Sequence, residues 1–280
     1  MFNSTANSTP SADMTAGRIS FTHPAYPADC VSPNFMTTEG ADEYPGFGGT
    51  GFFAKRRDAV FYITARHCLT KDQDANIAAL AARLHVPYTL SASTESTDDY
   101  VQFEDALSLK HESDDIPGRF IDVVVLTVHK PANAAVYNML LERAVKLPHD
   151  GQWLDRFAQH PVAKVDFDIG KGIRCTVMGY PHNGTASRIE YPDGKPVEIV
   201  TQAAKFSGFL GKGPGPDRYK LNDVDWPHDL NGFSGSPVIV GFSTPQGSSY
   251  ALAGMLVSGG AGMVQFIRVS LIVEALKEPY

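Results

Sequence analysis

The sequence predicts an all-β fold, built from short strands and interrupted by three helices. From Arg18 onward, apolar β-type runs alternate with turns rich in Gly, Pro, Asn and Asp. Many short strands separated by turn signals favour barrels or sandwiches over alternating strand–helix–strand units. The chain has 280 residues, 43% of them hydrophobic, which is enough to bury one large core or two smaller ones. The predicted strands include residues 51–54, 59–63, 121–128, 172–178, 197–203, 237–242 and 250–257.

Three helical segments interrupt these strands. Residues 75–84 are rich in alanine, and residues 270–278 form a predicted C-terminal helix. Residues 134–147 place apolar side chains at helical spacing, which predicts an amphipathic helix between two β-rich halves. Its apolar face contains Val136, Leu140, Ala144 and Leu147.

The chain therefore divides into four expected parts. Residues 1–17 are rich in Ser, Thr and Asn and have few apolar anchors, which predicts a disordered leader. Residues 18–130 form the N-terminal β-rich half, and residues 131–165 form a linker with the helical insertion. Residues 166–280 form the C-terminal β-rich half and end in the last helix. No internal repeat is visible.

Charge and cysteine content disfavour several functions. The formal net charge of −7 at pH 7 argues against a nucleic-acid partner, because phosphate binding needs a concentrated positive surface. The longest basic run, residues 55–57, is interpreted as a solvated turn or strand edge. Cys30, Cys68 and Cys175 lie far apart without CxxC spacing, so the sequence predicts neither a disulfide framework nor a metal site.

The N-terminal segment and the length of the apolar runs bear on the cellular location of the protein. The first 17 residues contain neither a basic n-region nor an apolar stretch, so they do not resemble a secretory signal. No segment approaches the roughly 18 apolar residues that a membrane span needs. We therefore expect a cytoplasmic protein with no membrane partner.

Three segments carry residue types that suit nucleophilic catalysis, in the chain order His, Asp, Ser. Residues 61–68 read as an apolar strand followed by His67. In residues 121–128, Asp122 is the one carboxylate at the start of a strongly apolar strand. In residues 231–238, Ser234 is flanked by glycines and leads into a strand.

The chemistry explains why these residue types belong together. A serine hydroxyl attacks well only when an adjacent base removes its proton. Imidazole, with an ordinary pKa of about 6.5, can take that proton and return it near neutral pH. A buried carboxylate fixes the imidazole tautomer and stabilises the imidazolium. We therefore predict Ser234 as nucleophile, His67 as general base and Asp122 as the group that orients His67.

The glycines beside the serine indicate where negative charge would be held. They let the backbone turn tightly, so that amide N–H groups converge where the charge develops. The predicted oxyanion donors are the N–H groups of Gly232 and Ser234. Each such donor contributes roughly 3 kcal/mol of transition-state stabilisation in well-studied hydrolases.

These segments resemble the motifs of the trypsin/chymotrypsin superfamily of serine peptidases, and they occur in that family's order. Residues 64–68 resemble its T-A-A-H-C motif, residues 122–126 its D-I-A-L-L motif, and residues 232–238 its G-D-S-G-G-P-V motif. Residues 48–53 resemble the glycine-containing strand that precedes the histidine strand. The similarity to bacterial trypsin-like and HtrA-like peptidases runs over about residues 46–276.

The resemblance implies two six-stranded antiparallel β-barrels, with a helical insertion, a C-terminal helix and an active-site cleft between the barrels. It implies a serine endopeptidase that forms an acyl-enzyme with a peptide or protein substrate and needs no cofactor or metal. Ser258, Gly259 and Gly260 resemble the strand that pairs with the substrate backbone. The sequence identifies no regulatory partner.

His228 lies where the family places the floor of the primary specificity pocket, although a surface loop is an alternative position for it. Asp225 and Asp229 nearby raise the alternative of a pocket for a basic side chain. We expect Cys68 to pack behind the histidine as a small apolar side chain. We expect residues 208–216 to form a loop near the substrate cleft.

Two residues depart from the family pattern. Phe233 stands where trypsins have the aspartate that pairs with the new N-terminal ammonium after zymogen cleavage. The sequence therefore predicts no activation of that kind. Ser236 replaces the second glycine of the serine motif and, being small, is compatible with catalysis.

Two alternative functions were weighed. An α/β-hydrolase esterase would carry its histidine after the nucleophile, but His228 is the last histidine of the chain and precedes Ser234. That alternative is excluded. A catalytically inactive trypsin-like fold that serves as a binding or scaffold module stays open, because residue types alone do not establish productive geometry.

Overall fold

The computed structural model describes most of the chain from Arg18 to Leu276. The described residues are 18–22, 29–38, 41–89, 91–93, 96–110, 120–130, 134–160, 172–182, 187–190, 198–226, 228–244, 247–260 and 262–276. The expected leader, residues 1–17, lies outside them. No helix within these ranges is long and apolar enough to cross a membrane.

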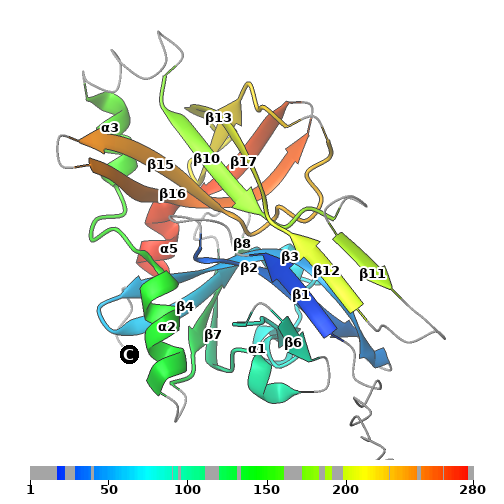
Figure 1. Cartoon of the computed structure of the whole chain (residues 1–280). Coiled ribbons are helices and arrows are strands. Elements are labelled where there is room, and N and C mark those ends of the chain that lie inside the picture. The colour runs from blue at the N-terminus through cyan, green and yellow to red at the C-terminus, as the bar shows by residue number, and fades with distance from the viewer. Residues whose placement is uncertain are drawn as a thin grey trace, which may run out of the picture.

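The C-terminal half contains a closed barrel of six antiparallel strands, in the order β10-β13-β14-β17-β16-β15 (Figure 1). Pairing of Cys175 with Val240 and of Val177 with Val238 closes the ring between β10 and β15. This barrel agrees with the one expected for this half. Its strands are β10 (Arg174–Gly179), β13 (Ala204–Lys212), β14 (Arg218–Asn222), β15 (Pro237–Thr244), β16 (Gly247–Gly260) and β17 (Met263–Arg268).

The N-terminal half forms a seven-stranded sheet in the order β5-β2-β3-β4-β8-β7, with β9 paired to β3. It differs from the expected six-stranded barrel because its edges, β5 and β7, are not joined by a continuous ladder in the described part of the chain. Its strands are β2 (Val31–Thr38), β3 (Ala41–Arg56), β4 (Ala59–Thr64), β5 (Leu84–His85), β7 (Phe103–Lys110), β8 (Phe120–Val128) and β9 (Val145–Lys146).

The N-terminal sheet comes close to closing. The segments next to its two edges approach each other through an isolated antiparallel bridge between Pro87 and Tyr100. On either side of this bridge, the Val101 N–H donates to the Val86 carbonyl at 2.9 Å and the Tyr88 N–H donates to the Asp99 carbonyl at 3.3 Å. Pro87 is tolerated there because a residue in a non-hydrogen-bonded pair donates no N–H to its partner strand.

A third sheet of four strands joins the two halves. Its order is β11-β12-β1-β6, and β1 pairs parallel to β12 and antiparallel to β6. Figure 1 shows β1 beside β12, although the paired residues, such as Arg18 and Glu198, lie 180 positions apart in the sequence. This sheet was not foreseen from the sequence. Its strands are β1 (Arg18–Thr22), β6 (Ser91–Ser93), β11 (Ser187–Glu190) and β12 (Glu198–Gln202).

The helices are shorter than the sequence suggested, and one more is present. The first expected helix shrinks to α1, where the Asn76 side chain accepts the N–H groups of Ala78 and Ala79, and β5 follows at Leu84. The middle helix, α2, ends at Arg143 because the chain enters β9 at Val145. A further helix, α3, lies in the stretch expected to be linker. The four described α-helices are α1 (Ile77–Ala81), α2 (Ala134–Arg143), α3 (Trp153–Gln159) and α5 (Val269–Ala275).

The C-terminal helix ties the halves together. Figure 1 shows α5 between the barrel and the N-terminal sheet. It buries Ile272 and Val273 in one apolar cluster with Phe52 and Ile63 of the N-terminal sheet and Met255 of the barrel. Because a common core crosses the boundary, the faces of the two halves are held in a fixed relation.

Candidate functional site

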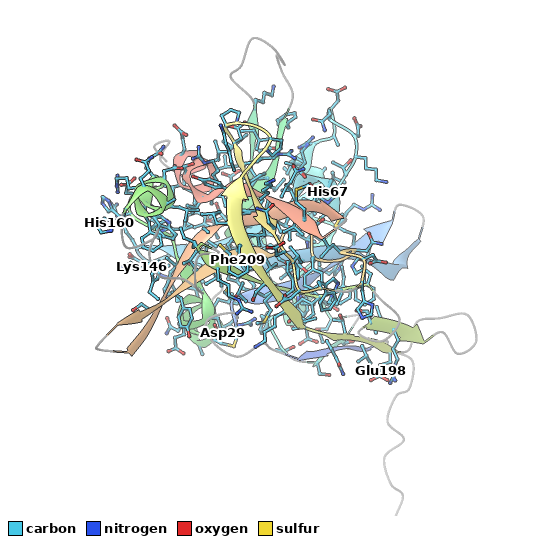
Figure 2. All side chains as sticks on the ribbon, turned by 90° about the horizontal axis from the view of Figure 1, so that it is seen from above. Asp29, His67, Lys146, His160, Glu198 and Phe209 are labelled. Carbon is cyan, nitrogen blue, oxygen red and sulfur yellow. The ribbon has the colours of Figure 1, made fainter. Side chains whose placement is uncertain are left out.

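His67 lies in a short 3₁₀ turn, Arg66–Cys68, that directly follows β4. The turn sends neighbouring side chains in opposite directions. His67 is exposed (labelled in Figure 2), whereas Arg66 is buried. The Arg66 guanidinium lies 4.2 Å from the centre of the Phe120 ring and donates to the Gln73 carbonyl at 2.9 Å. These contacts anchor the turn, while the imidazole of His67 lies exposed at the surface.

Asp122, at the start of β8, holds His67 through two hydrogen bonds. The carboxylate oxygen Oδ2 lies 2.7 Å from Nδ1 of the imidazole. The other oxygen, Oδ1, accepts the backbone N–H of His67 at 2.9 Å. Because Nδ1 faces a carboxylate, it carries the proton, and Nε2 is left to accept one. The sequence-predicted pairing of these residues is therefore present.

Ser234 lies in a turn that we call the Ser234 loop (residues 231–236), and the loop packs against the His67 turn. The Ser234 carbonyl accepts the Thr50 N–H at 2.9 Å and the Cys68 thiol at 3.4 Å. Ser234 thus lies beside the residue that follows His67. Among the described contacts, however, the Ser234 hydroxyl and the His67 imidazole share no hydrogen bond. Such bonds are often long in unliganded enzymes and tighten when substrate binds.

The backbone of the Ser234 loop leaves two N–H groups unpaired. The amides of Phe233, Gly235 and Ser236 donate to the carbonyls of Leu230, Leu256 and Phe233, at 2.8–3.0 Å. Within the described part of the chain, the amides of Gly232 and Ser234 have no acceptor. Most buried backbone donors in proteins are paired, so two neighbouring free donors are unusual. They are the two groups that the sequence predicted as oxyanion donors.

Two glycines make this turn possible. Gly232 has φ +91° and Gly235 has φ +88°, in the region that side chains other than glycine rarely adopt. A Cβ at Gly232 would lie 2.3 Å from the Tyr180 carbonyl oxygen, and one at Gly235 would lie 1.9 Å from the Thr50 carbonyl oxygen. Both positions therefore require glycine on conformational and steric grounds.

A pocket of about 460 Å³ opens beside Ser234. His228 lines it and meets the ring of Trp226 edge-to-face, with 5.5 Å between ring centres. The structure thus brings all four sequence-predicted substrate-binding residues to one pocket with Ser234. Its lining includes His228, Ser258, Gly259 and Gly260, together with Trp226, Leu230, Leu256 and Met263.

The two acidic residues predicted near the pocket, Asp225 and Asp229, differ in position. Asp225 pairs with Arg174 at 3.5 Å and is not among the lining residues. Asp229 does line the pocket, and its Oδ1 accepts the Asn231 N–H at 3.1 Å. Of the two carboxylates that suggested a basic substrate side chain, only Asp229 is thus at the pocket.

A second pocket, of about 580 Å³, lies on the His67 side of the site. Arg66, His67, Phe120 and Asp122 line it, together with the turn at residues 214–217 and the first residue of β14, Arg218. Residues 208–212 belong to β13, so the expected loop over 208–216 is shorter than predicted. The described residues contain no cluster of three metal-ligating side chains.

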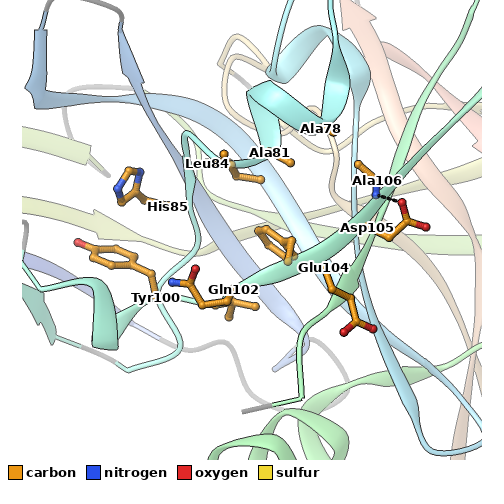
Figure 3. Close-up of a pocket in the computed structure, with 12 residues that line it drawn as sticks. Ala78, Ala81, Leu84, His85, Tyr100, Gln102, Glu104, Asp105 and Ala106 are labelled. Carbon is orange, nitrogen blue, oxygen red and sulfur yellow. Dashed lines mark hydrogen bonds between the residues drawn. The ribbon is translucent and has the colours of Figure 1, made fainter. Parts of the chain in front are cut away.

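A third pocket, of about 320 Å³, lies between α1 and β7 (Figure 3). Its lining includes His85 and Tyr100, whose rings meet edge-to-face with 5.0 Å between ring centres. It contains none of the residues predicted from the sequence to form the site, and we assign no role to it.

Phe233 and Cys68 occupy apolar surroundings. The Phe233 ring is fully buried and meets the edges of Phe206 and Trp226 at 5.0 and 5.1 Å between ring centres. Burial raises the pKa of the Cys68 thiol to about 12. This thiol is therefore protonated near neutral pH and a poor nucleophile.

Sequence reasoning missed the polar residues beneath the loop. Asn34, Thr50 and Thr64 are fully buried and hydrogen-bond to one another. The only local signal was the G-G-T-G segment at residues 48–51, in which Thr50 is surrounded by glycines.

No family model matches the chain, and no curated protein matches it. One similar solved structure comes from work on how aromatic interactions drive the coupled folding and binding of the intrinsically disordered Sesbania mosaic virus VPg protein. It is 12% identical in sequence, with a TM-score of 0.38 over 90% of this chain and 96% of that chain. A likeness at this level carries no argument about fold or function.

Proposed function

We propose that this protein is a serine endopeptidase of the trypsin-like type. Ser234 is the nucleophile, His67 the general base, and Asp122 the group that orients His67. The observation that carries the proposal is the pair of unpaired N–H groups, of Gly232 and Ser234, in a loop that contacts Cys68, the residue after the Asp122-bonded His67. Donors aimed at a developing oxyanion supply the largest single stabilisation in acyl-transfer enzymes.

The proposed reaction follows from these groups. The Ser234 oxygen attacks the peptide carbonyl carbon while His67 Nε2 takes the hydroxyl proton. The carbonyl oxygen becomes an oxyanion that accepts the N–H groups of Gly232 and Ser234. The C–N bond then breaks, and His67 gives its proton to the leaving amine. Water attacks the resulting acyl-enzyme by the same route and releases the acid and free Ser234.

An open strand edge supports a peptide substrate. Residues 258–260 pair with β17, through Ser258 with Gln265, Gly259 with Val264 and Gly260 with Met263. The described pairing of β16 with β15 ends at Met255, so this stretch has a strand neighbour on one side only. A substrate backbone can add to the free side as an antiparallel strand.

A trypsin-like double barrel is the fold that fits this activity. The closed C-terminal barrel would be its second barrel, and the N-terminal sheet would be its first. The near-closure of that sheet at Pro87 and Tyr100 supports this correspondence.

The second candidate is a binding or scaffold module with the same fold but without catalysis. It is favoured by one observation, the lack of a hydrogen bond between the Ser234 hydroxyl and the His67 imidazole. In that case the pocket beside Ser234 would bind a peptide without cleaving it.

A fluorophosphonate probe separates the two candidates, because it reacts only with an activated serine. We expect covalent labelling of the wild-type protein and loss of labelling in Ser234→Ala and His67→Ala. Ser236→Ala is the matched control, since it removes a buried hydroxyl two positions away. Failure to label the folded wild-type protein would favour the scaffold. Cleavage of a peptide library at wild-type rates by Ser234→Ala would end the assignment of the nucleophile.

A further inference from the structure

Thr50 belongs to β3 of the N-terminal half, yet it binds the Ser234 loop at two points. Its hydroxyl donates to the Gly232 carbonyl at 2.6 Å and accepts the Tyr180 N–H at 2.9 Å. Its backbone N–H donates to the Ser234 carbonyl at 2.9 Å. Thr50 is fully buried, so water does not compete for these bonds. One residue of the first half therefore fixes two carbonyls in the second.

The Gly232 carbonyl, which the Thr50 hydroxyl binds, lies between the two free N–H groups of the loop. The peptide plane of the free Gly232 N–H contains the Asn231 carbonyl, which accepts the His182 N–H at 2.9 Å. The peptide plane of the free Ser234 N–H contains the Phe233 carbonyl, which accepts the Ser236 N–H at 2.9 Å. The peptide plane between these two contains the Gly232 carbonyl, and the Thr50 hydroxyl holds it. Rotation of this middle plane would turn the two free N–H groups away from a common point.

Thr50 is itself held by a buried polar network. Its carbonyl accepts the Thr64 hydroxyl at 2.8 Å and the Asn34 side-chain amide at 3.2 Å. The same Asn34 amide donates to the Thr64 hydroxyl at 2.8 Å, and the Tyr62 hydroxyl donates to Asn34 Oδ1 at 2.5 Å. All four residues are fully buried. Fully satisfied networks of this kind fix one arrangement of the groups that they support.

We infer that Thr50 is a positioning residue for the proposed hydrolysis. Its hydroxyl holds the middle peptide plane so that the N–H groups of Gly232 and Ser234 point at one oxyanion. This role rests on the proposed function, because it concerns the same site. It also means that the donors of the C-terminal half depend on a side chain of the N-terminal half.

The test compares two substitutions that differ in the hydroxyl. Thr50→Val keeps the branched shape and removes the hydroxyl, whereas Thr50→Ser keeps the hydroxyl and removes the methyl group. The readout is the rate of fluorophosphonate labelling of Ser234, since the probe's phosphoryl oxygen needs the same two donors. We expect Thr50→Val to label at least tenfold more slowly and Thr50→Ser to stay within about threefold of wild type, given that losing one oxyanion donor costs about 10²–10³ in rate.

A matched control separates positioning from a general loss of stability. Tyr137 is also buried, and its hydroxyl accepts the Val60 N–H and donates to the Asp58 carbonyl, both at 3.1 Å, so these bonds involve no residue of the Ser234 loop. We expect Tyr137→Phe to lower the midpoint of thermal unfolding, as Thr50→Val does, but to label at the wild-type rate. The pH dependence of labelling should keep its midpoint in Thr50→Val, because the His67–Asp122 pair is untouched.

The outcomes distinguish the inference from the proposed function. If the folded wild-type protein does not label, the proposed function fails and the role of Thr50 fails with it. If wild type labels and folded Thr50→Val labels equally fast, the inference alone is overturned. Equal slowing in Thr50→Ser and Thr50→Val would also overturn it, since the hydroxyl would then not matter. Should Thr50→Val not fold, Thr50→Ala compared with Thr50→Ser gives the same answer.

Discussion

Replacing Phe233 by alanine should destabilise the protein strongly and loosen the Ser234 loop. The Phe233 ring is fully buried, and it meets two aromatic neighbours, Phe206 and Trp226, nearly edge-on, at 76° and 79°. The residue is also part of the backbone that carries the two unpaired N–H groups. The anchor of this part of the loop is therefore apolar packing.

The expected loss follows from this burial. A buried phenylalanine truncated to alanine costs about 3–5 kcal/mol, because transfer and cavity terms add. Each edge-to-face aromatic pair contributes about 0.5–1.5 kcal/mol beyond burial. Since two such pairs are lost together, we expect a loss of about 4 kcal/mol in the free energy of unfolding. Phe233→Leu keeps most of the apolar volume and should cost less than half as much.

Urea unfolding followed by tryptophan fluorescence measures the effect. Trp226 is one of two tryptophans and touches the Phe233 ring, so it reports on the altered site. A lower midpoint at an unchanged slope would give the stability loss directly. A loss below about 1 kcal/mol in Phe233→Ala, with the slope unchanged, would refute the view that this ring anchors the loop.

Three further predictions concern the backbone, the pH dependence and the substrate. Gly235→Ala should lower the midpoint of thermal unfolding sharply, because a Cβ there would lie 1.9 Å from the Thr50 carbonyl oxygen. Gly215→Ala is the control and should be neutral, since a Cβ at that position would have no atom within 4 Å. Equal midpoints of the two variants by circular dichroism would contradict this prediction. Burial lowers the pKa of His182, so the unfolded chain takes up the proton first and the free energy of unfolding should fall as pH drops from 8 to 5. That slope should flatten in His182→Phe, and identical slopes in urea titrations would argue against it. Because the more buried lining of the pocket beside Ser234 is apolar, peptide-library profiling should show cleavage after apolar residues, and a dominant preference for Lys or Glu would disprove this.

The strand pattern of the fold was readable from the sequence, but its long-range pairings were not. Alternating apolar runs and turn residues mark strands locally, and they located β4, β8, β12 and the barrel strands β10, β15 and β16. They found only residues 51–54 of β3 and missed the barrel strands β13, β14 and β17. The parallel pairing of β1 with β12 joins segments far apart in the chain and leaves no local signal. The isolated bridge between Pro87 and Tyr100 is likewise a pairing that no local pattern marks. The seven-residue α3 was too short to stand out from a linker.

The site shows the same division between local and non-local information. His67, Asp122 and Ser234 could be singled out because each lies in a short motif of recognisable residue types, and the structure pairs His67 with Asp122. Thr50 could not, since a threonine in a strand is common and its hydroxyl partner, the Gly232 carbonyl, lies 182 positions away. This contact is visible only in the three-dimensional structure.

The strand β1 has a mechanical consequence for how the two halves are held together. It is bonded to β12 along Arg18–Thr22 and to β6 through Ser91–Ser93, so a single strand links a segment of the C-terminal half to one of the N-terminal half. A hinge motion that swung the halves apart would shear these bonds. Under the proposed function, a peptide substrate would therefore reach Ser234 through movements of the surrounding turns. Cutting or displacing β1 would change how the Ser234 loop and the His67 turn lie against each other.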